Sequence, residues 1–229
     1  MVLNGGARTR PGWPTFDHER GLWDSGHRLV AGADEVGRGA WAGPVSVGVA
    51  VVEVGRPGSY PEGLRDSKLL SERRRESMFE DVAGWCTDWA VGHAGPEECD
   101  QRGMTAAIRL AAMRAWAQLR PVPDAVLVDG PRDLFGWTSG EEPCQVAGGP
   151  AVVPVVGGDA RCVSVAAASV LAKVVRDRIM REQAAHFPPY DFEQNKGYPS
   201  PSHRRALNGF GLSAIHRRSW SYVKELPWG

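Results

Sequence analysis

Blocks of hydrophobic positions divide the chain into predicted strands and helices. A short apolar run from Arg28 to Ala33 and a longer β-branched run from Val45 to Val54 are typical of buried strands. Three further strands are predicted at Trp89 to His93, Ala125 to Val128 and Ala151 to Val156. Most of these runs are too short for helices and are bounded by glycine, proline or charged residues.

Longer amphipathic segments predict the helices. Ser71 is the expected N-cap of a helix from Glu72 to Trp85, and its charged residues, Arg75 among them, are expected on the solvent-exposed face. Met104 to Leu119 predicts a second helix, and about Val163 to Gln183 a long third one. Strands alternating with helices indicate an α/β fold, with a mixed central sheet flanked by helices and a small helical C-terminal part.

Length and composition indicate one main domain. The 229 residues, 42% of them hydrophobic, suffice for one core. Residues 1–27 are polar and contain glycine and proline, so we expect a loosely ordered N-terminal extension before a domain at 28–229. The chain has neither an apolar run long enough to span a membrane nor a secretory signal, and we expect a cytoplasmic protein.

The cysteines and the charge balance restrict the chemistry. Cys86, Cys99, Cys144 and Cys162 are widely and unevenly spaced, which predicts reduced, mostly buried thiols and disfavours a zinc site or a disulfide framework. The net charge is zero, but residues 161–229 carry eleven Lys or Arg against five Asp or Glu. This asymmetry fits an acidic centre with a basic phosphate-binding part, and it fits an uneven solvated surface equally well.

Acidic residues stand beside glycine at the ends of three predicted strands. They are Asp34 with Glu35, Asp129 before Gly130, and Asp159 after Gly158. If these ends converge, the carboxylates would repel one another unless cations neutralise them, so the pattern predicts bound Mg²⁺ or Mn²⁺. Two such ions about 3.5 to 4 Å apart suit phosphodiester hydrolysis.

Each acidic residue also has a structural interpretation. Asp129 fits the first position of a type I turn, and Asp159 fits a helix cap. Asp34 and Glu35 are neighbours on a strand, so both reach one cleft only if the strand bends or ends there. Asp177 lies inside the last predicted helix, where ion pairs along that helix are expected.

The segment after the first strand adds a possible phosphate contact. Gly37, Arg38 and Gly39 follow the two carboxylates directly. Glycines on both sides of an arginine allow the backbone to approach a phosphate-bearing ligand closely. The metal-binding and substrate-binding groups are therefore expected side by side.

Six sequence blocks resemble, in order and spacing, the signature blocks of bacterial ribonuclease HII. They are ADEVGRGAWAGP, RDSKLLSERRR, LVDG, GGDARCVSVAAASVLAKVVRDR, NKGYPSPSH and IHRRSW, and together they cover roughly residues 28 to 225. The resemblance implies a ribonuclease H-like fold and cleavage of the RNA strand of RNA–DNA hybrids. It also implies incision on the 5′ side of a single ribonucleotide in duplex DNA, which starts ribonucleotide excision repair.

The resemblance assigns roles to particular residues. The family's four metal-binding carboxylates match Asp34, Glu35, Asp129 and Asp159. In the family they hold two Mg²⁺ or Mn²⁺ ions for in-line attack by water, which leaves a 5′-phosphate and a 3′-hydroxyl.

Further matches concern the substrate. The family contacts the 2′-hydroxyl through backbone groups that match Gly37, Arg38 and Gly39, and its junction-sensing tyrosine matches Tyr198. Lys68, Lys173 and Lys196 match family lysines and are expected either at phosphates or as surface charges.

The chain departs from the family pattern at two places. Gly157 replaces the usual lysine before the fourth carboxylate, which leaves that lysine's contribution to phosphate binding open. Ala40 and Trp41 stand where proline and leucine are commoner.

Ribonuclease HIII and a non-catalytic hybrid-binding protein are the two alternatives to ribonuclease HII. Ribonuclease HIII carries a sizeable N-terminal substrate-binding domain, whereas only about 30 residues precede the core here. A non-catalytic binder of hybrids would have no need for clustered like charges. A monomer is expected, and binding to a sliding clamp stays open.

Overall fold

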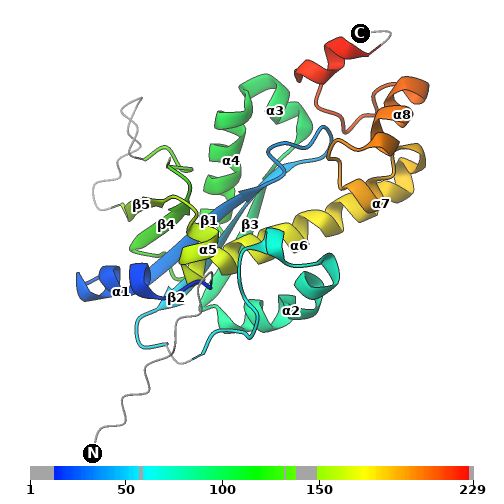
Figure 1. Cartoon of the computed structure of the whole chain (residues 1–229). Helices are drawn as coiled ribbons and strands as arrows, with labels where there is room; N and C mark the ends of the chain where they lie inside the picture. Colours follow the sequence, from blue (N-terminus) through cyan, green and yellow to red (C-terminus); the bar gives the residue numbers. More distant parts are fainter. Residues whose placement is uncertain (1–12, 57–58, 132, 138–148, 227–229) are drawn as a thin grey trace, which may run out of the picture.

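Five strands form one mixed sheet in the order β3-β2-β1-β4-β5 (Figure 1). The computed structural model describes residues 13–56, 59–131, 133–137 and 149–226. The strands are β1 Leu29–Val36, β2 Val45–Glu53, β3 Asp88–Ala94, β4 Ala125–Asp129 and β5 Ala151–Val155. β1, β2 and β3 pair antiparallel, whereas β4 runs parallel to both β1 and β5. The predicted mixed sheet is confirmed.

Helices cover both faces of the sheet. The α-helices are α1 Asp17–Asp24, α2 Glu72–Trp85, α3 Pro96–Arg102, α4 Met104–Trp116, α5 Gly158–Arg161, α6 Val163–His186, α7 Phe192–Asn195 and α8 Pro201–Phe210. Three short 3₁₀ helices are η1 Ser67–Leu69, η2 Pro188–Tyr190 and η3 Ser221–Glu225. α4 packs on one face, and α2 and α6 pack on the other (Figure 1).

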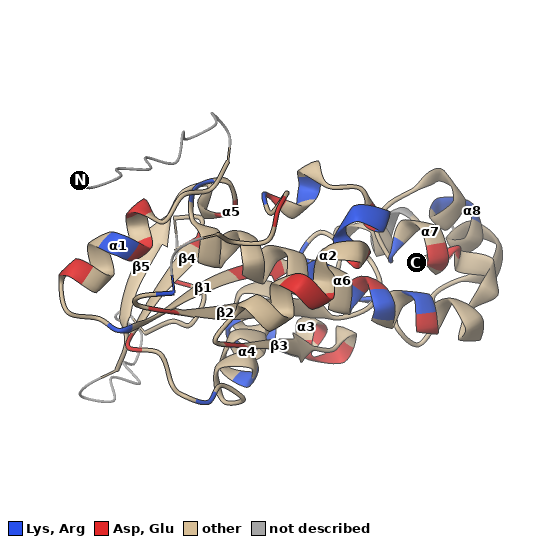
Figure 2. Ribbon diagram, turned by 90° about the horizontal axis from the view of Figure 1, so that it is seen from below, with Lys and Arg blue, Asp and Glu red and all other residues tan. Residues whose placement is uncertain are grey.

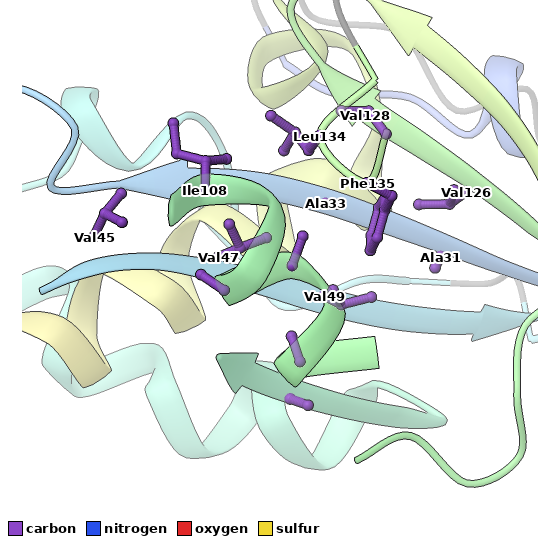
Figure 3. Close-up of a cluster of buried hydrophobic side chains, with 14 of the residues drawn as sticks. Ala31, Ala33, Val45, Val47, Val49, Ile108, Val126, Val128, Leu134 and Phe135 are labelled. Atoms are coloured by element: carbon purple, nitrogen blue, oxygen red, sulfur yellow. The ribbon is translucent and has the colours of Figure 1, made fainter. Parts of the chain in front are cut away.

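The alternation of side chains along β2 builds the two core layers. Val47 and Val49 face α4 together with residues of β1 and β4 (Figure 3). Ala50 and Val52 face α2 and α6 on the opposite side. Because both faces are covered, β2 is buried almost throughout, which explains its continuous apolar sequence.

Gly32 lets α6 pack directly against β1. A Cβ atom at Gly32 would lie 2.1 Å from the carbonyl carbon of Ser164 and 2.2 Å from the nitrogen of Val165. Both are backbone atoms of the first turn of α6, so no larger residue fits here without separating helix and strand. This contact fixes the start of α6 against the strand that carries Asp34.

The N-terminal segment differs from its prediction. Residues 1–12 lie outside the described part, but the expectation of loose order is wrong for residues 13–27, because α1 packs on the sheet. Phe16 is buried, and fully buried Glu19 accepts hydrogen bonds from the backbone N–H of Ser164 at 2.8 Å and from its hydroxyl at 2.7 Å. Glu19 thus caps the first turn of α6 from another element.

Arg75 also departs from its expected place. The predicted N-cap of α2 is confirmed, since the Ser71 hydroxyl accepts from the Arg74 N–H at 3.2 Å. Arg75, however, is only 9% exposed, donates to the Ser67 carbonyl at 2.9 Å and lies 3.6 Å from Asp177. Arg75 points into the contact between α2 and α6 because it pairs there with the Asp177 carboxylate on α6.

The C-terminal helical part forms its own apolar cluster at the end of α6. Trp41, Met180, Tyr190, Phe192 and Leu207 belong to this cluster, which joins α6 to α7, α8 and the segment after β1. The predicted helical C-terminal part is confirmed.

The predicted buried thiols are observed wherever the structure describes a cysteine. Cys86, Cys99 and Cys162 are buried free thiols, and Cys144 lies outside the described residues. Within the described ranges, no helix has the length and apolar character needed to cross a membrane.

Candidate active site

The ends of β1, β4 and β5 bring three aspartates together. Ala33 aligns with Val128 across the parallel β1–β4 pair, so Asp34 and Asp129 lie at the same edge of the sheet. Asp159 follows β5, the next strand, in the short helix α5. One carboxylate oxygen from each of the three lies within 4.8 Å of the others. The convergence expected for these three residues is therefore observed.

Hydrogen bonds at the start of α5 hold this group. Gly157, with φ 67° and ψ 37°, adopts the left-handed conformation that turns the chain from β5 into α5. The Gly158 N–H then donates to Asp129 Oδ1 at 2.7 Å. Asp129 thus supports the helix start in addition to facing the other carboxylates. Asp159 lies within α5 and is not the cap of α6, whose N-cap is Cys162.

The environment of the three aspartates is suited to a cation. Burial, together with the charges of Asp129 and Glu35, raises the pKa of Asp34 to about 8, although a hydrogen bond from Ser169 acts in the opposite direction. Burial and the charge of Asp159 also raise the pKa of Asp129. A bound divalent cation would offset the cost of burying these negative charges and reduce the repulsion between them. Carboxylate oxygens are ligands that Mg²⁺ and Mn²⁺ prefer, so the three aspartates fit either ion.

Lys68 partly compensates the cluster. Its Nζ lies 2.7 Å from Asp159 Oδ2, although its side chain is 70% exposed. Partial burial lowers the pKa of Lys68, but the contact with Asp159 outweighs this and raises it. Lys68 is therefore the predicted lysine that reaches the carboxylates themselves.

Glu35 lies outside the group of three. β1 pairs regularly with β2 through Val36, so the bend that would aim Glu35 and Asp34 at one side is not seen. The Glu35 carboxylate is 3.5 Å from the guanidinium of Arg38. It belongs to the same strand end, beside the aspartates but on the other face of β1.

The glycine–arginine–glycine segment forms a turn next to Tyr198. The Ala40 N–H donates to the Gly37 carbonyl at 3.2 Å, which leaves Arg38 and Gly39 exposed at the tip. The Gly37 N–H donates to the Tyr198 hydroxyl at 3.0 Å, across 161 positions of sequence. The turn and the tyrosine are thus in direct contact.

Two of the predicted lysines form ion pairs with carboxylates of the protein itself. Lys173 Nζ lies 2.6 Å from Asp177, and 5.6 Å from the centre of the Tyr198 ring. Lys196 is only 4% exposed and lies 3.1 Å from Glu72. A free phosphate contact does not fit the placement of Lys196, because its ammonium group is already buried against a carboxylate.

Ion pairs between α2 and α6 account for part of the basic surplus in the C-terminal part. Figure 2 shows Lys and Arg on these helices interspersed with Asp and Glu. Arg178 lies 2.8 Å from Glu76, and Arg181 lies 2.6 Å from Glu72. Asp177 forms an ion pair along α6 with Lys173, as expected, and Arg181 pairs with Glu72 on α2.

Two serines near the site were not predicted. The Ser169 hydroxyl hydrogen-bonds to Asp34, and a hydrogen bond of 2.8 Å joins its oxygen to the hydroxyl oxygen of Ser67. This bond joins α6 to η1, the element that carries Lys68. The sequence contains one signal for it: Ser164 and Ser169 are the only polar residues between Val163 and Ala172.

A buried histidine pair supports the Tyr198 loop and was also not predicted. His203 Nδ1 is 3.0 Å from the Tyr198 carbonyl and therefore donates to it. Its Nε2 accepts from His216 Nε2 at 2.9 Å, and His216 Nδ1 accepts from the N–H and hydroxyl of Ser213. Every partner is satisfied only while both imidazoles are neutral, and burial lowers the pKa of His216 to about 3.

The sheet order and the aspartates grouped at its parallel strand ends place the chain among the ribonuclease H-like α/β hydrolases. The family model described as Ribonuclease HII matches residues 31–223. The chain belongs to the ribonuclease HII family, as its sequence blocks indicated. It is therefore a metal-dependent endonuclease of the ribonuclease H type that acts on RNA–DNA hybrids.

Curated relatives cover most of the chain. A ribonuclease HII of Streptomyces avermitilis is 48% identical over 215 residues, 93% of this chain and 86% of the relative. A ribonuclease HII of Paracoccus denitrificans is 48% identical over 217 residues, 93% of this chain and 95% of the relative.

Solved structures share the fold. The crystal structure of ribonuclease H2 from Pyrococcus horikoshii has a TM-score of 0.72 and 29% identity, covering 86% of this chain and 96% of that one. A structure of Bst-RNase HIII in complex with Mn²⁺ has a TM-score of 0.66 at 18% identity, covering 86% of this chain and 68% of that one, and shows the fold alone.

Proposed function

We propose that this protein incises duplex DNA on the 5′ side of single embedded ribonucleotides, in addition to cutting hybrids, and so takes part in removing ribonucleotides from DNA. The observation that carries the proposal is one juxtaposition. Three carboxylates within 4.8 Å of one another lie at the end of the strand that leads into the turn bonded to Tyr198. The strand that carries Asp34 thus leads directly into the turn that is proposed to read the ribose.

The carboxylates are proposed to hold two Mg²⁺ or Mn²⁺ ions. Asp34, Asp129 and Asp159 supply the grouped oxygens. Glu35 lies outside this group, and its proposed role as a fourth ligand rests on its place at the end of β1, where the strand ends at Val36. When bound, such ions activate a water and stabilise the departing oxygen, which gives 5′-phosphate and 3′-hydroxyl products. Ser169 orients Asp34, and the Gly158 N–H orients Asp129.

Recognition of the ribose is assigned to the turn and Tyr198. A hydroxyl has one donor and two acceptor positions, so Tyr198, which accepts from Gly37, retains its own O–H for a ligand. Backbone groups of Arg38 and Gly39 at the exposed tip can contact the 2′-hydroxyl, the group that distinguishes RNA from DNA. Lys68, exposed beside Asp159, is proposed to meet a phosphate of the cleaved strand.

The catalytic part of the proposal is tested with Asp129→Asn. The amide keeps the size of the side chain but loses its charge, so cleavage of a duplex with one ribonucleotide should fall at least about a hundredfold while binding stays near that of the wild type. Asp81→Asn, on the exposed face of α2, is the control and should retain full activity. Full activity of Asp129→Asn would refute the assignment, and equal inactivity of the wild type would favour a non-catalytic hybrid-binding protein.

The recognition part is tested with Tyr198→Ala and Tyr198→Phe. Loss of the ring should impair incision at a single ribonucleotide more than cleavage within a long hybrid, because only the former depends on one sugar. Tyr198→Phe separates the hydroxyl from the ring. Equal losses on both substrates would remove the junction role of Tyr198.

A further inference from the structure

Two arginines are fully buried beneath the ribose-reading turn. Arg176 on α6 and Arg217, in the segment after α8, are both 0% exposed. Their guanidinium groups make six hydrogen bonds, and each one ends on an uncharged backbone carbonyl. These contacts differ from those of Arg178, two residues further along α6, which pairs with Glu76.

Arg176 joins the segment after β1 to the loop that carries Tyr198. Its Nε donates to the Pro44 carbonyl at 2.9 Å and its Nη2 to that of Ala42 at 3.3 Å. Its Nη1 donates to the Lys196 carbonyl at 3.0 Å, and its Cζ lies 5.2 Å from the centre of the Tyr198 ring. One planar group therefore sets the spacing of the two segments.

Arg217 holds the same turn from the other side. Its Nη1 donates to the Arg38 carbonyl at 3.0 Å, and its Nε and Nη2 donate to the Gly43 carbonyl at 3.2 and 3.0 Å. Its own N–H donates to the Trp41 carbonyl at 2.8 Å. The exposed tip at Arg38 is thus tied directly to a buried guanidinium.

Gly37 packs on the first of these groups. An added Cβ atom would lie 2.2 Å from Arg176 Nε, and φ at Gly37 is +84°, in the region that favours glycine. The residue whose N–H bonds to Tyr198 therefore rests on Arg176 as well. The turn, the tyrosine and the guanidinium form one packed unit.

Packing alone does not explain why two charged side chains are buried here. Carbonyl dipoles satisfy the donors but bring no negative charge, so burying two cations side by side costs free energy. A lysine would carry the same charge without the rigid fork that bridges several carbonyls. What the fork provides is a fixed geometry of the surrounding backbone.

We propose that Arg176 and Arg217 are positioning residues for ribose recognition, which lock the turn at residues 37–44 and the Tyr198 loop into their binding geometry before substrate arrives. This inference rests on the proposed function of the turn. Preorganisation of this kind improves discrimination because the ordering cost is met during folding and not during binding. The proposed role of the two arginines concerns recognition of the ribose and does not involve the three grouped aspartates.

The test compares Arg176→Lys and Arg217→Lys with the control Arg178→Lys. Affinities are measured in excess chelator, which prevents cleavage, for a duplex with one ribonucleotide and for the same duplex made only of DNA. The preference is the ratio of the two affinities, and in both lysine variants it should be about tenfold smaller than in the wild type. This is the effect expected when one hydrogen bond to a charged group is lost. Arg178→Lys should keep the preference, and Mn²⁺ affinity should be unchanged in all three variants.

The outcomes separate the two claims. If the wild type shows no preference for the ribonucleotide, the proposed function of the turn fails. If the wild type discriminates and both lysine variants discriminate equally well, only the role of the arginines is refuted. Equal loss of affinity for both duplexes, or failure of both variants to fold, would assign the arginines to stability alone and overturn the inference.

Discussion

Replacing Gly32 by alanine should push α6 away from β1, destabilise the protein and disturb the support of Asp34. The added methyl carbon would lie 2.1 Å from the Ser164 carbonyl carbon, whereas ordinary contacts begin at 3.4 Å. Since the obstructing atoms are backbone, no side-chain rotation relieves the clash. Helix and strand must move apart by roughly 1.3 Å, which also draws Ser169 away from Asp34.

The magnitude follows from the rigidity of both partners. Overpacking a well-filled core costs about 1 to 3 kcal/mol, and the larger values apply where no side chain can yield. We therefore expect Gly32→Ala to lower the free energy of unfolding by about 3 kcal/mol. Displacement of Ser169 should weaken Mn²⁺ binding in the protein that remains folded.

Urea unfolding followed by tryptophan fluorescence measures the effect. The matched control is Gly21→Ala on the exposed face of α1, where nothing lies within 4 Å of the new methyl group. Because alanine favours helix, this control should gain up to about 1 kcal/mol. A Gly32→Ala protein within about 0.5 kcal/mol of the wild type would refute the close packing of α6 on β1.

Two further predictions concern stability. Because the His203–His216 pair must stay neutral, we expect the protein to become less stable as the pH is lowered. In the unfolded chain His216 takes up a proton near pH 6.5, whereas in the folded protein it does so only near pH 3. Lowering the pH from 7.5 to 5 should therefore reduce the free energy of unfolding by about 2 kcal/mol through this group. Urea titrations of wild type and His216→Asn measure it, and a difference between them that does not change with pH would contradict it. Glu19→Ala should cost about 2 kcal/mol, because the Ser164 N–H and hydroxyl lose their acceptor. Asp17→Ala, exposed on the same helix, is its control, and equal stability of both variants would show that Glu19 does not anchor α6.

The strands and the carboxylate group could be predicted because their signals are local. The β-branched run of β2 and the Ser71 cap depend on residues close in sequence. Parallel neighbours must end at one edge of a sheet, so Asp34, Asp129 and Asp159 could be expected together once the strands were assigned.

The remaining features depend on distant partners. Arg75 has the residue type of an exposed helical position and is buried because Asp177 lies opposite on α6. Helix α1 is polar in sequence, yet it docks because Glu19 meets the start of α6, 145 positions away. The buried contacts of Arg176, Arg217 and Lys196 likewise required the folded chain.

Cleavage of an end-labelled duplex with one ribonucleotide, in Mg²⁺, in Mn²⁺ and in excess chelator, tests the central claim most directly. A metal-binding carboxylate group beside a ribose-reading turn predicts a single cut on the 5′ side of the ribonucleotide with either metal, leaving a 3′-hydroxyl that a polymerase can extend. It predicts no cut in chelator and none in the all-DNA duplex. Cleavage that persists in chelator, or equal cleavage of the all-DNA duplex, would contradict it.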